Sequence, residues 1–231
     1  MIPLRDDNPS RITPVVTFSL IGACVLAFLW QLSLGPGANE RAIYVFGVIP
    51  AVLFHQADLP DGFAVIPPFA TVFSSMFLHG GFMHLAGNML YLWIFADNVE
   101  DSMGHARFVV FYLLCGIAAA MAQALPDPSS QVPMIGASGA ISGVLGAYLL
   151  LYPRARVFVV IPLGFFMHTM RLPAGWVLGL WFLLQLLSEL MTPPGSAGVA
   201  FRAHLGGFVA GLVLIFFFKR SSLRLLNPRR Y

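Results

Sequence analysis

The chain has 231 residues, of which 58% are hydrophobic and only 10% are charged, with a formal net charge of +3. Soluble domains carry about 25% charged residues, so this composition excludes a water-soluble globule and predicts an integral membrane protein in contact with the lipid bilayer. No basic stripe interleaved with aromatic residues runs through the sequence, which argues against nucleic acid as a partner.

The first apolar segment follows a charged N-terminal stretch and has no convincing small-residue cleavage site. We therefore interpret it as a spanning helix and not as a removed signal peptide. A membrane crossing needs about 20 mostly apolar residues, and six segments approach that length. The sequence predicts spans at residues 13–34, 83–99, 106–125, 138–152, 174–190 and 200–218.

The stretch 157–190 is too long for one span and is interrupted by His168, Arg171 and Pro173. We assign 174–190 to the fifth span and interpret 157–172 as an interfacial lead-in. Counting that lead-in as a seventh span would place the basic C-terminal tail outside, which the positive-inside rule disfavours. We therefore expect an all-α integral membrane protein, a six-transmembrane-helix bundle that forms one domain over 1–231.

Six spans place both termini on one side of the membrane, and the basic residues indicate which side. Arg41 and Arg202 are the basic residues expected on the far side. Because cytoplasmic loops are enriched in Lys and Arg, both termini are predicted to be cytoplasmic. The basic residues expected on that side are Arg5, Arg11, Arg107, Arg154, Arg156, Arg171, Lys219, Arg220, Arg224, Arg229 and Arg230.

The connection over residues 36–78 is long and semi-apolar, with phenylalanines among prolines. It is too interrupted for a clean span. We interpret it as a loop that lies partly in the outer interface, and loops of this length are usually functional or disordered.

The second, fourth and sixth spans run from outside to inside on this topology and carry polar residues at their N-terminal ends. Fifteen residues separate Ser138 from Pro153, and fifteen separate His204 from Lys219. At about 1.5 Å rise per residue, each polar group lies about 22 Å above the cytoplasmic interface. The hydrocarbon core is about 30 Å thick, so Ser138 and His204 are expected at the same depth, below the outer surface.

A serine hydroxyl is a weak nucleophile until a neighbouring base accepts its proton. His204 is the candidate base, which would later return that proton to the leaving amine. Glu189 and Asp127 are expected near the outer edge, where neither is clearly available to orient the histidine. A two-residue dyad of Ser138 and His204 is therefore the expected catalytic unit.

Donors for an oxyanion come from two places in the sequence. The backbone N–H of Ser138 lies near the start of a helix, where the dipole is positive. His84 and Asn88 are four residues apart and so share one helical face. Polar residues in a membrane normally face the interior of the bundle, which predicts that these groups converge.

Two small-residue pairs predict which helices touch. Gly139 and Gly143 lie on the fourth span, and Gly207 and Gly211 lie on the sixth. Such pairs allow helix backbones to approach closely, so the fourth and sixth spans are the predicted contact pair. Cys24 and Cys115 fall in apolar segments and are interpreted as small core residues, with neither a disulfide framework nor metal spacing.

Together these residues resemble the rhomboid family of intramembrane serine proteases over about residues 12–218. The motifs are His79-x-x-x-x-His84-x-x-x-Asn88, Gly136-Ala137-Ser138-Gly139 and Ala203-His204-Leu205-x-Gly207-x-x-x-Gly211, with Glu100-Asp101-x-x-Gly104 and Arg107-Phe108 beside them.

The resemblance implies that Ser138 is the nucleophile, His204 the base, and His84 and Asn88 the oxyanion donors, with His79 in a polar cavity that opens outward. The loop between the first two spans would lie in the outer leaflet, and the fifth span would move to admit substrate. The implied substrates are single-span transmembrane proteins, cleaved near the outer face without a cofactor or metal. Gly136, Gly139 and Gly207 would support the site.

One position departs from the pattern of some bacterial members, which carry an aromatic residue four positions after the nucleophile, packed against the catalytic histidine. Here that position is Ser142. The support of His204 is therefore expected from elsewhere, and Trp181 and Gln185 of the fifth span could also line a substrate gate.

Two other classes of function remain open at this stage. A haem-binding electron-transfer protein could use His84 and His204 as axial ligands, but it leaves the serine and glycine motif unexplained. A transporter usually has midplane ionisable residues or an internal repeat, and we find neither. The absence of targeting features weakly favours a prokaryotic plasma membrane.

Overall fold

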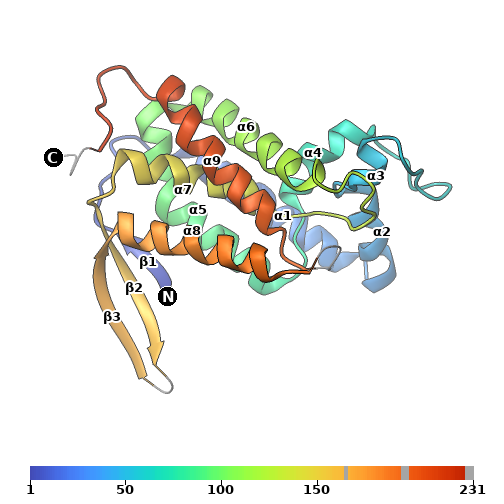
Figure 1. Ribbon diagram of the computed structural model, residues 1–231, viewed down its shortest axis with the longest axis horizontal. Coiled ribbons are helices and arrows are strands. Elements are labelled where there is room, and N and C mark those ends of the chain that lie inside the picture. The colour runs from blue at the N-terminus through green and yellow to red at the C-terminus, as the bar shows by residue number, and fades with distance from the viewer. Residues whose placement is uncertain (164–165, 194–197, 227–231) are drawn as a thin grey trace.

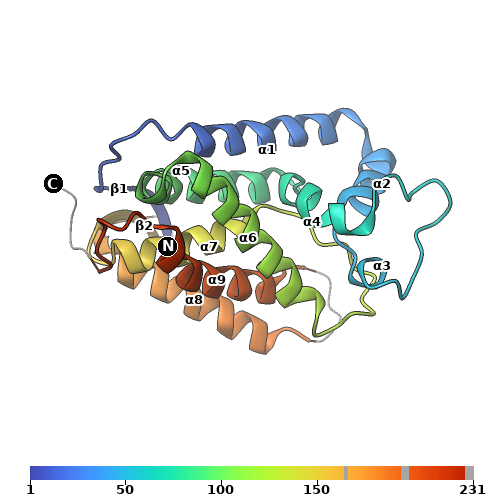
Figure 2. The ribbon, with the colours of Figure 1, turned by 90° about the horizontal axis from the view of Figure 1, so that it is seen from above.

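The computed structural model describes residues 1–163, 166–193 and 198–226 of the chain. Long helices run alongside one another in a bundle, and a small sheet projects from one end of it (Figures 1 and 2). The long helices are α1 (Val15–Ser33), α5 (Phe82–Met103), α6 (His105–Ala124), α7 (Ser138–Leu151), α8 (Ala174–Met191) and α9 (Phe201–Phe218).

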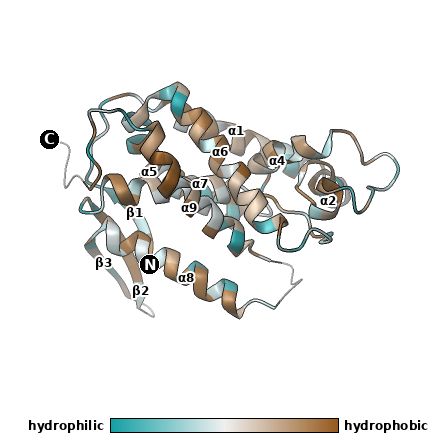
Figure 3. Ribbon diagram, turned by 45° about the horizontal axis from the view of Figure 1, so that its top comes forward, coloured by the Kyte–Doolittle hydropathy of each residue, from teal (hydrophilic) through white to brown (hydrophobic). Residues whose placement is uncertain are grey.

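A helix lies within or close to each of the six ranges that the sequence predicts as spans. Four of them, α1, α6, α8 and α9, are long and apolar enough to cross a membrane. The helix α7 is apolar but has only 14 residues, and α5 carries His84 and Asn88 within it and acidic residues at its end. Crossing of the bilayer by all six stays a prediction. In Figure 3 hydrophobic residues cover much of the helices, and hydrophilic ones gather toward the loops and helix ends.

The N-terminal strand and the last described residue lie at the same end of the bundle. Strand β1 (Ile2–Asp6) pairs with β2, which follows α7. The amide of Leu226 donates to the carbonyl of Leu150 at the end of α7, and the amide of Arg220 donates to that of Ser102 in α5. This is the end predicted to be cytoplasmic; Arg229 and Arg230, which the sequence assigned to it, lie outside the described residues.

The expectation of an all-α fold is wrong at this end of the molecule. Strands β2 (Arg156–Leu163) and β3 (Phe166–Pro173) form an antiparallel hairpin, and β1 completes a sheet in the order β1-β2-β3. The stretch 157–161 consists of β-branched and aromatic residues, which favour strands. Val157 and Val159 are buried in the core. The expected interfacial lead-in is thus two strands of a sheet.

The connection over 36–78 is also more ordered than a loop. It holds α2 (Pro36–Phe46), α3 (Pro50–Leu53), α4 (Thr71–Ser74) and the 3-10 helices η1 (Pro68–Ala70) and η2 (Ser75–Phe77). Proline stands at the start of α2, α3 and η1, where its fixed φ suits a first helical turn. Val48 exchanges backbone hydrogen bonds of 3.0 and 2.8 Å with Met134, so this segment holds the chain that leads into α7.

The close packing of α7 against α9 depends on glycines, as the spacing predicted. A Cβ atom on Gly207 would lie 2.0 Å from the carbonyl oxygen of Gly139, and one on Gly211 would lie 1.9 Å from that of Gly143. Contacts between backbones this close exclude any side chain. The two helices therefore meet in one fixed arrangement.

Candidate active site

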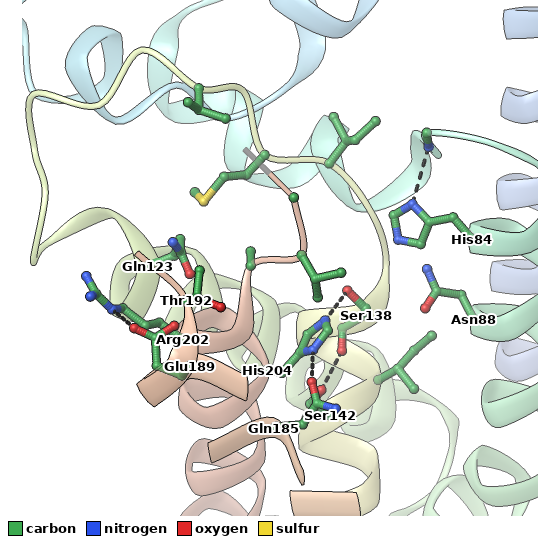
Figure 4. A pocket seen from close by; sticks show the side chains of 18 of the residues that line it. His84, Asn88, Gln123, Ser138, Ser142, Gln185, Glu189, Thr192, Arg202 and His204 are labelled. Atoms are coloured by element: carbon green, nitrogen blue, oxygen red, sulfur yellow. Dashed lines mark hydrogen bonds and ion pairs between the residues drawn. The ribbon is translucent and has the colours of Figure 1, made fainter. Parts of the chain in front are cut away.

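A cavity of about 1230 Å³ lies at the end of the bundle opposite the sheet. It is enclosed by the N-terminal parts of α5, α7 and α9, the C-terminal part of α8, and the segment before α7 (Figure 4). Its lining is mainly apolar, and polar groups converge at its base from several helices. Its polar lining residues include His84, Asn88, Gln123, Ser138, Gln185 and His204.

Ser138 and His204 are in direct contact within this cavity. Ser138 is the first residue of α7, and His204 lies in the first turn of α9. The Nε2 atom of His204 is 2.8 Å from Oγ of Ser138, a normal hydrogen-bond distance. Because Gly207 allows α9 to lie against Gly139 of α7, the two helix starts are held side by side. A hydroxyl in this contact can pass its proton to the imidazole.

The second ring nitrogen of His204 contacts α8, a helix for which the sequence suggested only a role as a substrate gate. The Nδ1 atom of His204 is 2.7 Å from Oε1 of Gln185. The ring of Trp181, one turn earlier, lies 6.0 Å from the imidazole at 36°. Ser142, at the position where some bacterial members carry an aromatic residue, donates to the carbonyl of Ser138 within α7 at 2.7 Å. The aromatic support of His204 thus comes from a different helix.

Gly136 lies between Ser138 and the predicted oxyanion donor His84, where only glycine fits. Its φ of +122° is favourable for glycine alone, and a Cβ there would lie 2.8 Å from the His84 ring. Its amide donates to the carbonyl of Ser75 at 2.8 Å. The first glycine of the motif therefore both turns the chain into α7 and leaves room for His84.

His84 and Asn88 lie beside Ser138 on the α5 side of the cavity (Figure 4). Nδ1 of His84 accepts a hydrogen bond of 3.3 Å from the amide of Gly80, so its other nitrogen carries the proton and can donate. Nδ2 of Asn88 is buried and has no hydrogen-bond partner among the described residues. Buried donors are usually satisfied, which makes this amide a candidate to bind a ligand atom.

His79 does not lie in the cavity as the resemblance implied. Its side chain is 1% exposed, and its ring packs edge-on against His84 at 5.2 Å. Its backbone N–H donates to Oε1 of Gln31 at 2.9 Å, and its carbonyl accepts from Nε2 of the same residue at 3.1 Å. His79 therefore supports His84 from behind.

Several polar residues near the site were not assigned from the sequence. Gln123 of α6 accepts from the amide of Ala203 at 3.3 Å, and Arg202 forms an ion pair with Glu189. One signal was present in the sequence: Trp181, Gln185 and Glu189 recur every four residues, which places them on one helical face. That face lies against α9.

Fold and site together define an integral membrane protein with a serine–histidine pair in a cavity between its helices. The family model of the Rhomboid domain matches residues 67–221, which is more than half of the chain and includes both residues. The chain belongs to the rhomboid family.

Curated relatives agree with this assignment. The chain is 29% identical to RHOMBOID-like protein 5 of Arabidopsis thaliana over 68% of its length, and 32% identical to rhomboid protease GluP of Bacillus subtilis over 59%. It is 30% identical to Rhomboid protein 1, mitochondrial, of Saccharomyces cerevisiae over 62%. The matches cover 46%, 24% and 40% of these relatives, so the chain spans less than half the length of each. Since one relative is named as mitochondrial, the prokaryotic plasma membrane stays a prediction.

Proposed function

We propose that the protein is an intramembrane serine protease in which Ser138 is the nucleophile and His204 the general base. The observation that carries this proposal is the 2.8 Å contact between Nε2 of His204 and Oγ of Ser138. The imidazole takes the hydroxyl proton as the oxygen attacks the peptide carbonyl, and it then donates a proton to the leaving amine. To hydrolyse the acyl-enzyme, a water molecule gives a proton to Nε2 of His204 as it attacks the acyl carbon. The bond to Oγ of Ser138 then breaks, and His204 returns the proton to that oxygen.

The oxyanion of the tetrahedral intermediate would be bound from the α5 side. The amide nitrogen of Asn88 is buried without a partner, and His84 can donate through its Nε2–H. The backbone N–H of Ser138 adds a donor at the start of α7, where the helix dipole favours negative charge. Donors fixed before the reaction stabilise developing charge without reorganisation.

The substrates we propose are single-span membrane proteins, with cleavage near the outer face. The catalytic pair lies at the end of the bundle opposite the basic end, which we propose to be cytoplasmic in a six-span topology. The cavity is mostly apolar and bordered by α8, a helix whose large side chains Leu183, Leu187 and Leu190 are exposed and would face lipid. An extended segment of a transmembrane substrate suits such a site.

Haem ligation is disfavoured by the contacts of His204. Both of its ring nitrogens are already engaged, one by Ser138 and the other by Gln185. An axial ligand needs one of them free, so iron binding would require the contact with either Ser138 or Gln185 to break.

The test is cleavage of a tagged single-span substrate by the purified protein in liposomes. The wild type should release a fragment cut within or near the transmembrane segment, and Ser138→Ala and His204→Ala should release none while eluting as folded protein. Cleavage by Ser138→Ala at the wild-type rate would overturn the proposal.

A further inference from the structure

We infer that Gln185 is a positioning residue for His204: its side-chain oxygen holds the proton of the imidazole on Nδ1 and so keeps Nε2 free to accept the proton of Ser138. This inference rests on the proposed function. It replaces the expected two-residue unit by a Ser138–His204–Gln185 triad in which the third residue is neutral and only orients the histidine.

The chemistry follows from which atoms can donate. A neutral imidazole carries one proton, on either nitrogen. An amide oxygen only accepts, and Oε1 of Gln185 lies 2.7 Å from Nδ1, so the proton belongs on Nδ1. Nε2 then presents its lone pair to the hydroxyl 2.8 Å away. In soluble serine proteases a buried carboxylate fixes this tautomer; a neutral amide does so here without placing a charge among apolar helices.

Trp181 fixes the plane of the same ring. It lies four residues before Gln185 and so on the same face of α8. Its ring is stacked on Phe208 at 6.0 Å, and Phe208 is itself 2% exposed. The imidazole is thereby bounded by an aromatic face beside it and by an acceptor at its Nδ1 edge, both from α8. Trp181 and Gln185 together provide the support of the imidazole that Ser142 of α7 cannot provide.

The orientation of His204 depends on how α8 is attached to the rest of the bundle. Its buried residues, Ala174, Val177 and Leu178, all lie near its beginning. Its later part is held to α9 by the side chains of Gln185 and Glu189 and by ring contacts to Phe208. If this part of α8 moved away from α9, His204 would lose its orienting group. Alignment of the base is therefore coupled to the seating of α8.

The experiment compares the rate at which a fluorophosphonate probe labels Ser138 in purified variants. Gln185→Leu keeps the size of the side chain but removes the acceptor, and we expect the rate to fall about tenfold, the value of one neutral hydrogen bond. Gln185→Glu keeps an acceptor and should retain most of the rate. Glu189→Gln is the matched control, because it weakens the other polar link between α8 and α9 without removing the acceptor at Nδ1 of His204, and its labelling rate should fall much less than that of Gln185→Leu.

The pH profile separates orientation from simple attachment of the helix. A carboxylate at position 185 favours the protonated imidazole, so the acidic limb of labelling should move to higher pH by about one unit in Gln185→Glu. Among the described residues, the ionisable groups that line this cavity besides His204 are His84 and Tyr91 of α5, Asp127 before α7, Glu189 of α8 and Arg202 of α9, while α6 and α7 present Gln123 and Ser138. All of these are unchanged in the variant, so the shift reports the new carboxylate.

Three outcomes are distinguishable. Labelling of Gln185→Leu at the wild-type rate would overturn the inference, as would equal losses in Gln185→Leu and Glu189→Gln, which would indicate attachment of α8 only. Wild-type protein that does not label at Ser138 would instead contradict the proposed function itself.

Discussion

The two flanks of α9 are built differently. On one side α9 lies against α7 through glycines, with backbone atoms in contact and no side chain between Gly211 and Gly143. On the other side α8 is joined to α9 by longer side chains, among them Gln185 and Glu189. His204 stands between these flanks and touches both: Ser138 on the fixed side and Gln185 on the loosely attached side.

This difference separates two requirements of catalysis. The distance between nucleophile and base must be constant, and a glycine interface has only one close-packed arrangement. The orientation of the base depends on α8, whose later part is held by a few polar and aromatic contacts. In the proposed mechanism, the nucleophile and its base therefore lie on two helices joined through glycines, and the residue that orients the base lies on α8, whose buried residues are all near its beginning.

Outside the Ser138–His204 pair, the largest expected effect is at the proposed oxyanion donors of α5, the helix that lies beside Ser138. Asn88→Ala removes a buried amide without a protein partner, and labelling and cleavage rates should fall by about 10²–10³-fold, the cost of losing one fully used donor. Thermal stability should not fall, because no hydrogen bond within the protein is lost. Unchanged rates in Asn88→Ala would show that the amide serves another purpose.

The next largest effect is expected at the glycine interface between α7 and α9. Gly211→Ala places a Cβ 1.9 Å from the carbonyl oxygen of Gly143, so the helices must separate, at a cost of about 1–3 kcal/mol or more. Gly179→Ala in α8, where nothing lies within 4 Å, is the control and should be neutral or stabilising. Unfolding in detergent, followed by circular dichroism, measures both. Equal stability of the two variants would contradict the contrast between the flanks.

The fixed part extends to the basic end, where Asp6 of β1 accepts a hydrogen bond from the hydroxyl of Tyr148 in α7. Burial, opposed by that hydrogen bond, raises the pKa of Asp6 from 3.8 to about 6. Because this pKa is raised, the contribution of Asp6 to the stability of the fold is fully present below about pH 4 and is lost as the pH rises through about 6. Asp6→Asn should remove this loss, so the stability of the variant relative to the wild type should rise between pH 4 and pH 7. Melting temperatures of both proteins across that range test this prediction. A constant difference between the two proteins at every pH would contradict it.

The smallest expected effect is on the loosely attached side. The ion pair between Glu189 and Arg202 is partly exposed, at 19% and 37%, and such pairs contribute about 0–1 kcal/mol. Glu189→Gln should therefore change the melting temperature little, and salt should reduce even that difference. A loss as large as that of Gly211→Ala would show that α8 is held as firmly as α7.

Sequence reasoning succeeded where apolar length and residue counting decide the answer. The six helices follow from the lengths of the apolar runs. The equal distance of Ser138 and His204 from the basic end predicted only that they lie at the same depth, and the structure adds that their side chains are in contact. The hairpin of β2 and β3 was missed because an apolar run such as 157–163 has no period that separates a strand from a lead-in. The role of Gln185 could not be predicted, since it depends on the rotation of α8 against α9, which spacing within one helix leaves undetermined.

The central claim is that Ser138 is a nucleophile activated by His204. Its most direct test is to label the purified protein with a fluorophosphonate probe, map the modified residue by mass spectrometry, and compare the wild type with Ser138→Ala and His204→Ala. The structure predicts a single adduct on Ser138 that is lost in both variants, with Ser142, one turn along α7, unmodified. Labelling of Ser138 that persists in His204→Ala at the wild-type rate would contradict the account.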